Sequence, residues 1–136
     1  MNVDLNRNAI SATDAEYKPA AKATCEMTCA PVKTKGIGPA PRFKHSAECF
    51  KGYYIVHGGR NDSMYCDNLK TVAFNDFHML DMRTNTWNTV ALFADEIPES
   101  RWGHSLCAST NRLLIFGGMN LYSYCESVCY EVVIGK

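Results

Sequence analysis

The sequence predicts an all-β fold made of antiparallel sheets, and two observations lead to this prediction. The chain contains one twenty-residue segment twice, RFKHSAECFKGYYIVHGGRN at 42–61 and RWGHSLCASTNRLLIFGGMN at 101–120. After residue 38, short runs rich in aromatic and β-branched residues alternate with Gly, Asn, Asp and Pro, which is typical of strands and turns. Because an internal repeat marks a repeat architecture, we expect copies of one supersecondary unit.

The two copies align without a gap at an offset of 59 residues. Identical residues at equivalent positions are Arg42/Arg101, His45/His104, Ser46/Ser105, Gly58/Gly117, Gly59/Gly118 and Asn61/Asn120. One departure stands out, because His57 lies where the second copy has Phe116. The repetition indicates that these residues serve the structure of each copy.

Seven strands are predicted, at 45–50, 53–58, 77–82, 86–92, 104–109, 113–118 and 127–134. The second strand of each copy is almost continuously apolar, which indicates burial on both faces. The glycine pair after it indicates positive φ or close approach to a neighbour. Trp87 opens the fourth strand and is expected to anchor one sheet on the next. No helix longer than two turns is predicted in this region.

Four short antiparallel strands in about fifty residues correspond to one blade of a β-propeller. The order of motif residues resembles the kelch repeat, and the structural set comprises Arg42, His45, Ser46, Gly58, Gly59, Asp81, Trp87, Arg101, His104, Ser105, Gly117 and Gly118. Glu131 is expected in the place of Asp81 in the second copy, which stops before any Trp. The resemblance therefore implies kelch-type β-propeller blades in an incomplete propeller, with repeat 1 at 39–100 and an incomplete repeat 2 at 101–136.

Residues 1–38 are rich in Ala, Thr, Lys and Pro and show little periodicity, so we expect an irregular or partly disordered arm. The formal net charge is +0, which argues against nucleic acid or an anionic membrane as a partner. No apolar run has the 18 or more residues of a membrane span. The polar N-terminus lacks the apolar core of a secretory signal, and we expect a cytoplasmic protein.

Seven cysteines are present, at positions 25, 29, 49, 66, 107, 125 and 129. An odd number in a chain expected to be cytoplasmic does not predict a disulfide framework. Two C-x3-C pairs, Cys25/Cys29 and Cys125/Cys129, have a spacing found in zinc sites. Joining them would require the N-terminal arm to fold onto the last strand, and Cys129 in its apolar run is expected to be a small buried residue. We predict no metal and no cofactor, although metal binding by the cysteines stays open.

The pairs His45-Ser46 and His104-Ser105 resemble parts of a serine hydrolase site. Adjacent strand residues point to opposite faces, so neither histidine can activate its own serine. The chain has no Gly-x-Ser-x-Gly elbow. Since His57 is replaced by Phe in the second copy, the sequence His57-Gly58-Gly59 indicates a strand end rather than an oxyanion loop. We therefore predict no catalytic residue and no enzyme activity.

The resemblance implies a protein-interaction module or scaffold that binds partners through loops at one end of the propeller. These loops are 60–74 and 88–100, and their candidate binding residues are Arg60, Asn61, Asp62, Tyr65, Asn68, Lys70, Asp95 and Glu96. The alternative is a regulatory or substrate-binding kelch segment of a larger enzyme, such as a kelch-fused serine/threonine phosphatase or a ubiquitin-ligase adaptor. At least three repeats are normally needed for stability, so we expect either a longer parent chain or self-association to complete the propeller.

Overall fold

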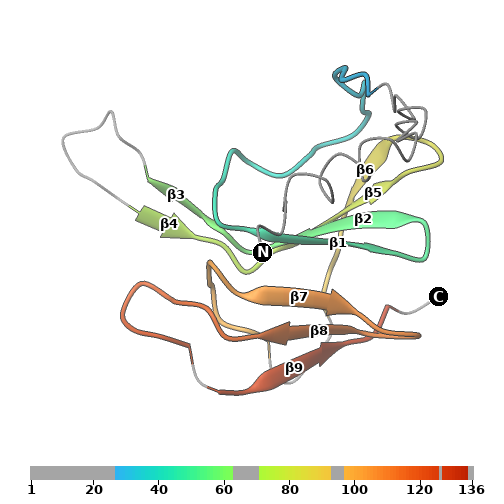
Figure 1. Cartoon of the computed structure of the whole chain (residues 1–136). Coiled ribbons are helices and arrows are strands. Elements are labelled where there is room, and N and C mark those ends of the chain that lie inside the picture. Colours follow the sequence, from blue (N-terminus) through green and yellow to red (C-terminus); the bar gives the residue numbers. More distant parts are fainter. Residues whose placement is uncertain (1–26, 63–70, 93–96, 126, 135–136) are drawn as a thin grey trace, which may run out of the picture. The chain divides into compact units, whose positions relative to one another are not determined.

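The computed structural model describes residues 27–62, 71–92, 97–125 and 127–134 (Figure 1). The chain divides into two units, residues 1–31 and 32–136. Of the first unit only residues 27–31 are described, and they carry no strand or helix. Nine strands lie in the described part of the second unit. None of the described elements is a helix of the length and hydropathy needed to cross a membrane.

The first sheet has four antiparallel strands in the order β1-β2-β5-β6 (Figure 1). They are β1 (Ser46–Phe50), β2 (Tyr53–His57), β5 (Phe77–Asp81) and β6 (Thr86–Thr89). Lys51 and Gly52 both have positive φ, 49° and 84°, as a two-residue hairpin turn between β1 and β2 requires. The carboxylate of Asp81 accepts hydrogen bonds from the amides of Arg83 (2.8 Å) and Thr84 (3.2 Å), which shape the turn into β6.

The second sheet has three antiparallel strands in the order β7-β8-β9. They are β7 (Ser105–Ala108), β8 (Leu113–Phe116) and β9 (Cys129–Val132). The predicted all-β class and the four plus three strands of the two repeats are confirmed. Two further strands, β3 (Arg60–Asp62) and β4 (Thr71–Ala73), pair as a short ribbon within the segment predicted to be a loop.

The core lies between the two sheets and consists of six buried side chains: Phe50, Ile55, Phe77, Met79, Leu113 and Ile115. In β2 the last three residues, including Val56 and His57, are all buried, as the continuous apolar run predicts. In β8 only alternate residues are buried, and its last residue is exposed. The difference arises because the first sheet is covered on both faces at this point, whereas the described residues cover only one face of β8.

The register of β9 corrects one sequence-based assignment. In the first sheet Met79 pairs with Ile55, and Asp81 follows two residues later. In the second sheet Glu131 pairs with Leu114, which is equivalent to Ile55 at the 59-residue offset. Glu131 therefore occupies the position of Met79, and its assignment to the place of Asp81 is wrong. The loop before β9 differs in length from its counterpart, so the acidic residue alone was a poor guide to register.

A segment within the predicted N-terminal arm is hydrogen-bonded to the first sheet. The amide of Lys35 donates to the carbonyl of Asn85 (2.8 Å), and the amide of Trp87 donates to the carbonyl of Lys35 (2.9 Å). A Cβ added to Gly38 would lie 3.1 Å from the Trp87 indole nitrogen, which shows close packing. Trp87 thus lies against this segment and near His78, and not in the core between the sheets as expected. The predicted division of the chain at residue 38 stays a prediction.

Candidate functional site

The two repeated arginines make the same contacts in both sheets. The Arg42 guanidinium donates to the carbonyl two residues earlier (3.0 Å) and to the Gly58 carbonyl (3.0 Å). The Arg101 guanidinium donates to the carbonyl two residues earlier (3.1 Å) and to the Gly117 carbonyl (3.0 Å). Each arginine therefore ties the segment that enters its first strand to the glycine pair that ends its second strand.

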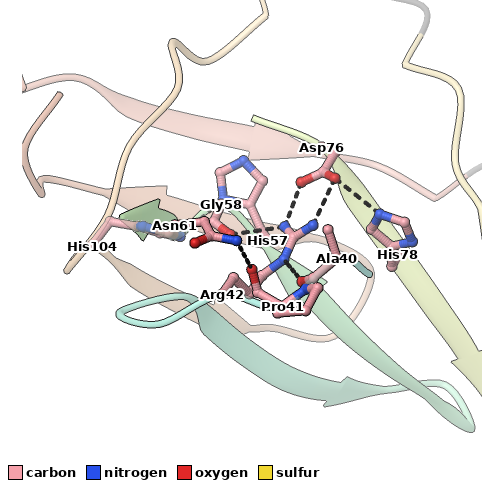
Figure 2. Close-up of polar contacts among 9 residues, drawn as sticks. All are labelled: Ala40, Pro41, Arg42, His57, Gly58, Asn61, Asp76, His78 and His104. Carbon is pink, nitrogen blue, oxygen red and sulfur yellow. Dashed lines mark hydrogen bonds and ion pairs between the residues drawn. The ribbon is translucent and has the colours of Figure 1, made fainter. Parts of the chain in front are cut away.

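Asp76 lies between Arg42 and His78, as Figure 2 shows. Its two carboxylate oxygens accept hydrogen bonds from Arg42 at 2.6 and 3.0 Å, and one of them lies 2.9 Å from Nε2 of His78. Burial raises the pKa of Asp76, but the hydrogen bonds from Arg42 and His78 outweigh it and hold that pKa below its usual value. Sequence reasoning did not assign Asp76 a role, although an isolated acid just before an apolar strand was the available signal.

A buried histidine pair joins the two sheets. Nδ1 of His57 lies 2.9 Å from Nε2 of His104, and the two rings meet edge to face with centroids 4.8 Å apart. Burial, and then the neighbouring His104, lower the pKa of His57 from 6.5 to about 3. Burial, followed by the nearby Arg101, lowers the pKa of His104 to about 4. Both imidazoles are therefore neutral at pH 7, and one donates to the other.

The repeated serines do not form hydrolase-type pairs with histidine in the described structure. The Ser46 hydroxyl donates to the backbone carbonyl of His104 and contacts no imidazole nitrogen. The other ring nitrogens of the buried pair, Nε2 of His57 and Nδ1 of His104, have no hydrogen-bond partner among the described residues. The geometry of this cluster supports a contact that holds the sheets together.

The glycine pairs differ in what surrounds them. A Cβ at Gly58 would lie 2.6 Å from the Arg101 carbonyl oxygen, and one at Gly59 would lie 2.9 Å from Cβ of His45. At Gly118 the added atom would lie 2.9 Å from the equivalent Cβ of His104. Gly117 is the exception, because no described atom lies within 4 Å of the same addition. Three of the four glycines therefore have a steric reason to lack a side chain.

Three of the predicted binding residues, Arg60, Asn61 and Asp62, form strand β3. Arg60 makes a two-point ion pair with Asp62 at 3.0 and 2.6 Å, and the Asn61 amide donates to the carbonyl of Pro41 (2.9 Å). All three are half-buried. The remaining predicted binding residues lie outside the described part of the chain: Tyr65, Asn68, Lys70, Asp95 and Glu96.

A loop that sequence reasoning did not single out presents aromatic side chains in the second repeat. Tyr122 is 93% exposed and Tyr124 is 79% exposed. The side-chain oxygen of Asn120 accepts hydrogen bonds from the amides of Tyr122 (2.9 Å) and Ser123 (2.7 Å). The side-chain nitrogen of Asn120 donates to Glu99 (2.8 Å). We call residues 119–124 the tyrosine loop; its signal in the sequence was the segment MNLYSY after the glycine pair, in which four of six residues are apolar.

The described residues hold no group of three or more His, Cys, Asp or Glu side chains arranged to bind a metal ion. The cysteines among them are free, at positions 29, 49, 107, 125 and 129. Cys129 is exposed, so its predicted burial is wrong. It lies on β9, in the sheet where one face is uncovered, and an apolar sequence pattern cannot reveal whether a neighbour is present.

Comparison with known proteins matches most of the chain to one family. The model of the KLHDC2/KLHL20/DRC7 Kelch-repeats domain matches residues 15–134. Host cell factor of Drosophila melanogaster is 31% identical over 106 residues, which are 73% of this chain and 7% of the relative. Kelch domain-containing protein 3 of Bos taurus is 30% identical over 102 residues, 71% of this chain and 25% of the relative. Acyl-CoA-binding domain-containing protein 4 of Arabidopsis thaliana is 30% identical over 103 residues, 75% of this chain and 14% of the relative. The chain spans a quarter or less of the length of these relatives.

Proposed function

Because the chain belongs to the kelch-repeat family and its two sheets are blades of a β-propeller, we propose that it is a non-catalytic module that binds other proteins through loops at one end of the blades. The resemblance and fold class predicted from the repeats are confirmed. Kelch-repeat domains are generally interaction modules, and the binding surface proposed below depends on this general function. Blade 1 denotes the sheet β1-β2-β5-β6, and blade 2 the sheet β7-β8-β9.

The tyrosine loop carries the proposal. Tyrosine is enriched at interface hot spots because it offers a large contact area with a polar tip. Asn120 holds the loop by hydrogen bonds to two of its backbone amides, which reduces the ordering cost of binding. The loop follows the second strand of blade 2, and the candidate residues of β3 follow the second strand of blade 1. Because the two loops follow equivalent strands, we expect them to lie at the same end of the blades and to form one binding surface.

The polar contacts within the blades support a non-catalytic role. Arg42 and Arg101 bind backbone carbonyls of their own blades, and the buried histidines contact each other across the blades. These groups serve packing, whereas the tyrosine side chains are exposed and serve no described internal contact. Loops on a rigid scaffold are a common place for binding residues.

The test is affinity capture from a cell extract with the double variant Tyr122→Ser/Tyr124→Ser. Met82→Ser is the control, since Met82 is an exposed apolar residue after β5, at the opposite end of the blade from His57. We expect the affinity of the double variant for proteins captured by the wild type to fall by about 30-fold or more, because truncation of a hot-spot residue costs about 2 kcal/mol or more. The control should retain them.

A second variant shortens residues 60–74 to the length of the matching loop in blade 2 and should also weaken capture. Circular dichroism and thermal unfolding establish that each variant is folded. If both folded variants keep every partner at wild-type affinity, the loops are not the binding surface.

A further inference from the structure

Blade 1 holds blade 2 through an edge and a short segment. The segment is 101–104, which enters blade 2, and the edge is formed by residues 44–46 and 57–60 of blade 1. Three hydrogen bonds join them: from the Gly59 amide to the Arg101 carbonyl (2.8 Å), from the Gly103 amide to the Lys44 carbonyl (2.8 Å) and from the Ser46 hydroxyl to the His104 carbonyl. The His57–His104 contact and the Arg60 guanidinium, 4.7 Å from the Trp102 ring centre, add to the junction. The Arg101 amide also donates to the Phe74 carbonyl (3.0 Å), outside the edge as defined.

The internal repeat supplies both halves of this junction a second time. The segment equivalent to 101–104 is 42–45 of blade 1, which we call the docking segment. The edge equivalent to that of blade 1 is 103–105 with 116–119 of blade 2, which we call the receiving edge. Lys44 and Gly103 belong to both junctions but through different backbone groups: the existing junction uses the Lys44 carbonyl and the Gly103 amide, and an equivalent one would use the Lys44 amide and the Gly103 carbonyl. Each chain therefore carries one docking segment and one receiving edge whose equivalent backbone groups its own junction does not use.

Each spare half exposes a large apolar side chain in the described structure. Phe116 on the receiving edge is 51% exposed, whereas the equivalent His57 is 0% exposed. Phe43 in the docking segment is 42% exposed, whereas the equivalent Trp102 is 6% exposed. The large differences at equivalent positions show what a neighbouring blade covers, and they mark one exposed apolar residue on each spare half.

The residues that differ between the spare halves and the existing junction suit each other. Arg60, whose guanidinium lies over Trp102, is replaced at the receiving edge by Met119. In an equivalent junction Met119 would meet Phe43, which is an apolar pair of a kind that proteins favour. Open space beside Gly117 replaces the close contact beside Gly58, so the equivalent approach of an Arg42 carbonyl has room.

We propose that the receiving edge of one copy binds the docking segment of a second copy of this chain, head to tail. The contact joins two different surfaces, and repeated contacts of this kind form a closed ring only if the rotation from copy to copy closes. Because the blades of a propeller are arranged around a closed ring, a contact that repeats the junction between blades 1 and 2 has a rotation that closes. Propellers close with about four to eight blades, and each copy supplies two, so rings of two to four copies result. Tyr122 and Tyr124 lie outside both surfaces as defined, so failure of partner binding and failure of association are separate outcomes.

Sedimentation equilibrium of the 136-residue chain over a wide range of concentration tests the proposal. We expect the mass to rise with concentration from the 15.2 kDa of one chain to a plateau at two to four times this value. Phe116→Asp places a charge on the receiving edge, and Phe43→Asp places one on the docking segment. Each variant alone should remain a monomer, while Met82→Asp, an exposed apolar residue in neither surface, should associate like the wild type.

Mixing the two blocked variants distinguishes a head-to-tail contact from a symmetric one. The Phe116→Asp chain keeps its docking segment, and the Phe43→Asp chain keeps its receiving edge, so the mixture should form a one-to-one dimer and nothing larger. Thermal unfolding of each variant verifies that it is folded. A wild-type chain that stays at monomer mass at every concentration would overturn the proposal and leave a further repeat or another protein as the occupant. Association that survives both substitutions, or a mixture that stays monomeric, would overturn it as well.

Discussion

Replacement of Gly58 and of Gly117 by alanine compares two equivalent positions that differ in one physical respect. Both glycines have positive φ, +64° and +71°, so an added Cβ imposes similar backbone strain, about 1–2 kcal/mol. The surroundings differ, because a Cβ at Gly58 would lie 2.6 Å from the Arg101 carbonyl oxygen and 2.8 Å from Cε1 of His104. No described atom lies within 4 Å of the same Cβ at Gly117.

The size of the difference follows from how firmly the clashing atoms are held. The Arg101 carbonyl accepts a hydrogen bond of 2.8 Å from the amide of Gly59, so it can move away only if blade 2 shifts against blade 1. Overpacking of a fitted contact costs about 1–3 kcal/mol. We therefore expect Gly58→Ala to lower the free energy of unfolding by about 2–5 kcal/mol, and Gly117→Ala by about 1–2 kcal/mol.

Equilibrium unfolding in urea measures both free energies. The measurement is made in the Phe43→Asp background, which should keep the chain monomeric. A second copy docked beside Gly117 would otherwise place atoms next to the new side chain, and the two glycine sites would no longer differ in their surroundings. A Gly58→Ala variant no less stable than Gly117→Ala would refute the reasoning, since the junction between the blades would then tolerate a side chain where the structure leaves no room.

Two further predictions concern charged groups. Asp76→Asn removes the charge partner of Arg42, whose side chain is 3% exposed. It should lower the free energy of unfolding by about 2 kcal/mol at pH 7, a value reduced for the partial exposure of Asp76. Because the folded pKa of Asp76 lies below 3.8, the difference in stability between wild type and variant, measured by urea unfolding, should shrink as the pH falls through that pKa. The histidine pair should make the wild type less stable as the pH falls from 6.5 toward 4, by about 2 kcal/mol per histidine at pH 5, because His57 and His104 bind protons in the unfolded chain but resist them when folded. His57→Phe, the residue of the second copy, should halve this loss, and equal wild-type stability at pH 7 and pH 5 would contradict the sign of both shifts.

Most of the strand order could be predicted from the sequence because its signals are local. The repeated apolar runs and the turn residues between them, such as Lys51-Gly52, act within a few residues of one another. Strands β3 and β4 escaped prediction because each has three residues, and β3 is wholly polar. Their pairing depends on each other and not on a pattern within either one.

The candidate site was less accessible to sequence reasoning. Arg42 and Asp76 are 34 residues apart, and His57 and His104 are 47 apart, so no spacing rule connects them. The binding residues were sought in polar loop positions of the first copy, whereas the exposed tyrosines lie in the second. The tyrosine loop is rich in apolar residues, and this composition became a sign of exposed side chains only once the strands on either side of the loop were known.

By itself, the sequence of this protein determines two copies of one blade, because alternation, turns and glycine pairs are written into each copy within about fifty residues. The tertiary structure alone decides which copies of the repeated residues are covered. Equivalent residues have nearly the same backbone setting, but His57 is enclosed by blade 2 while Phe116 faces no described neighbour. Burial is a property of what packs against a surface and not of the surface itself, so two similar strands can differ completely in exposure.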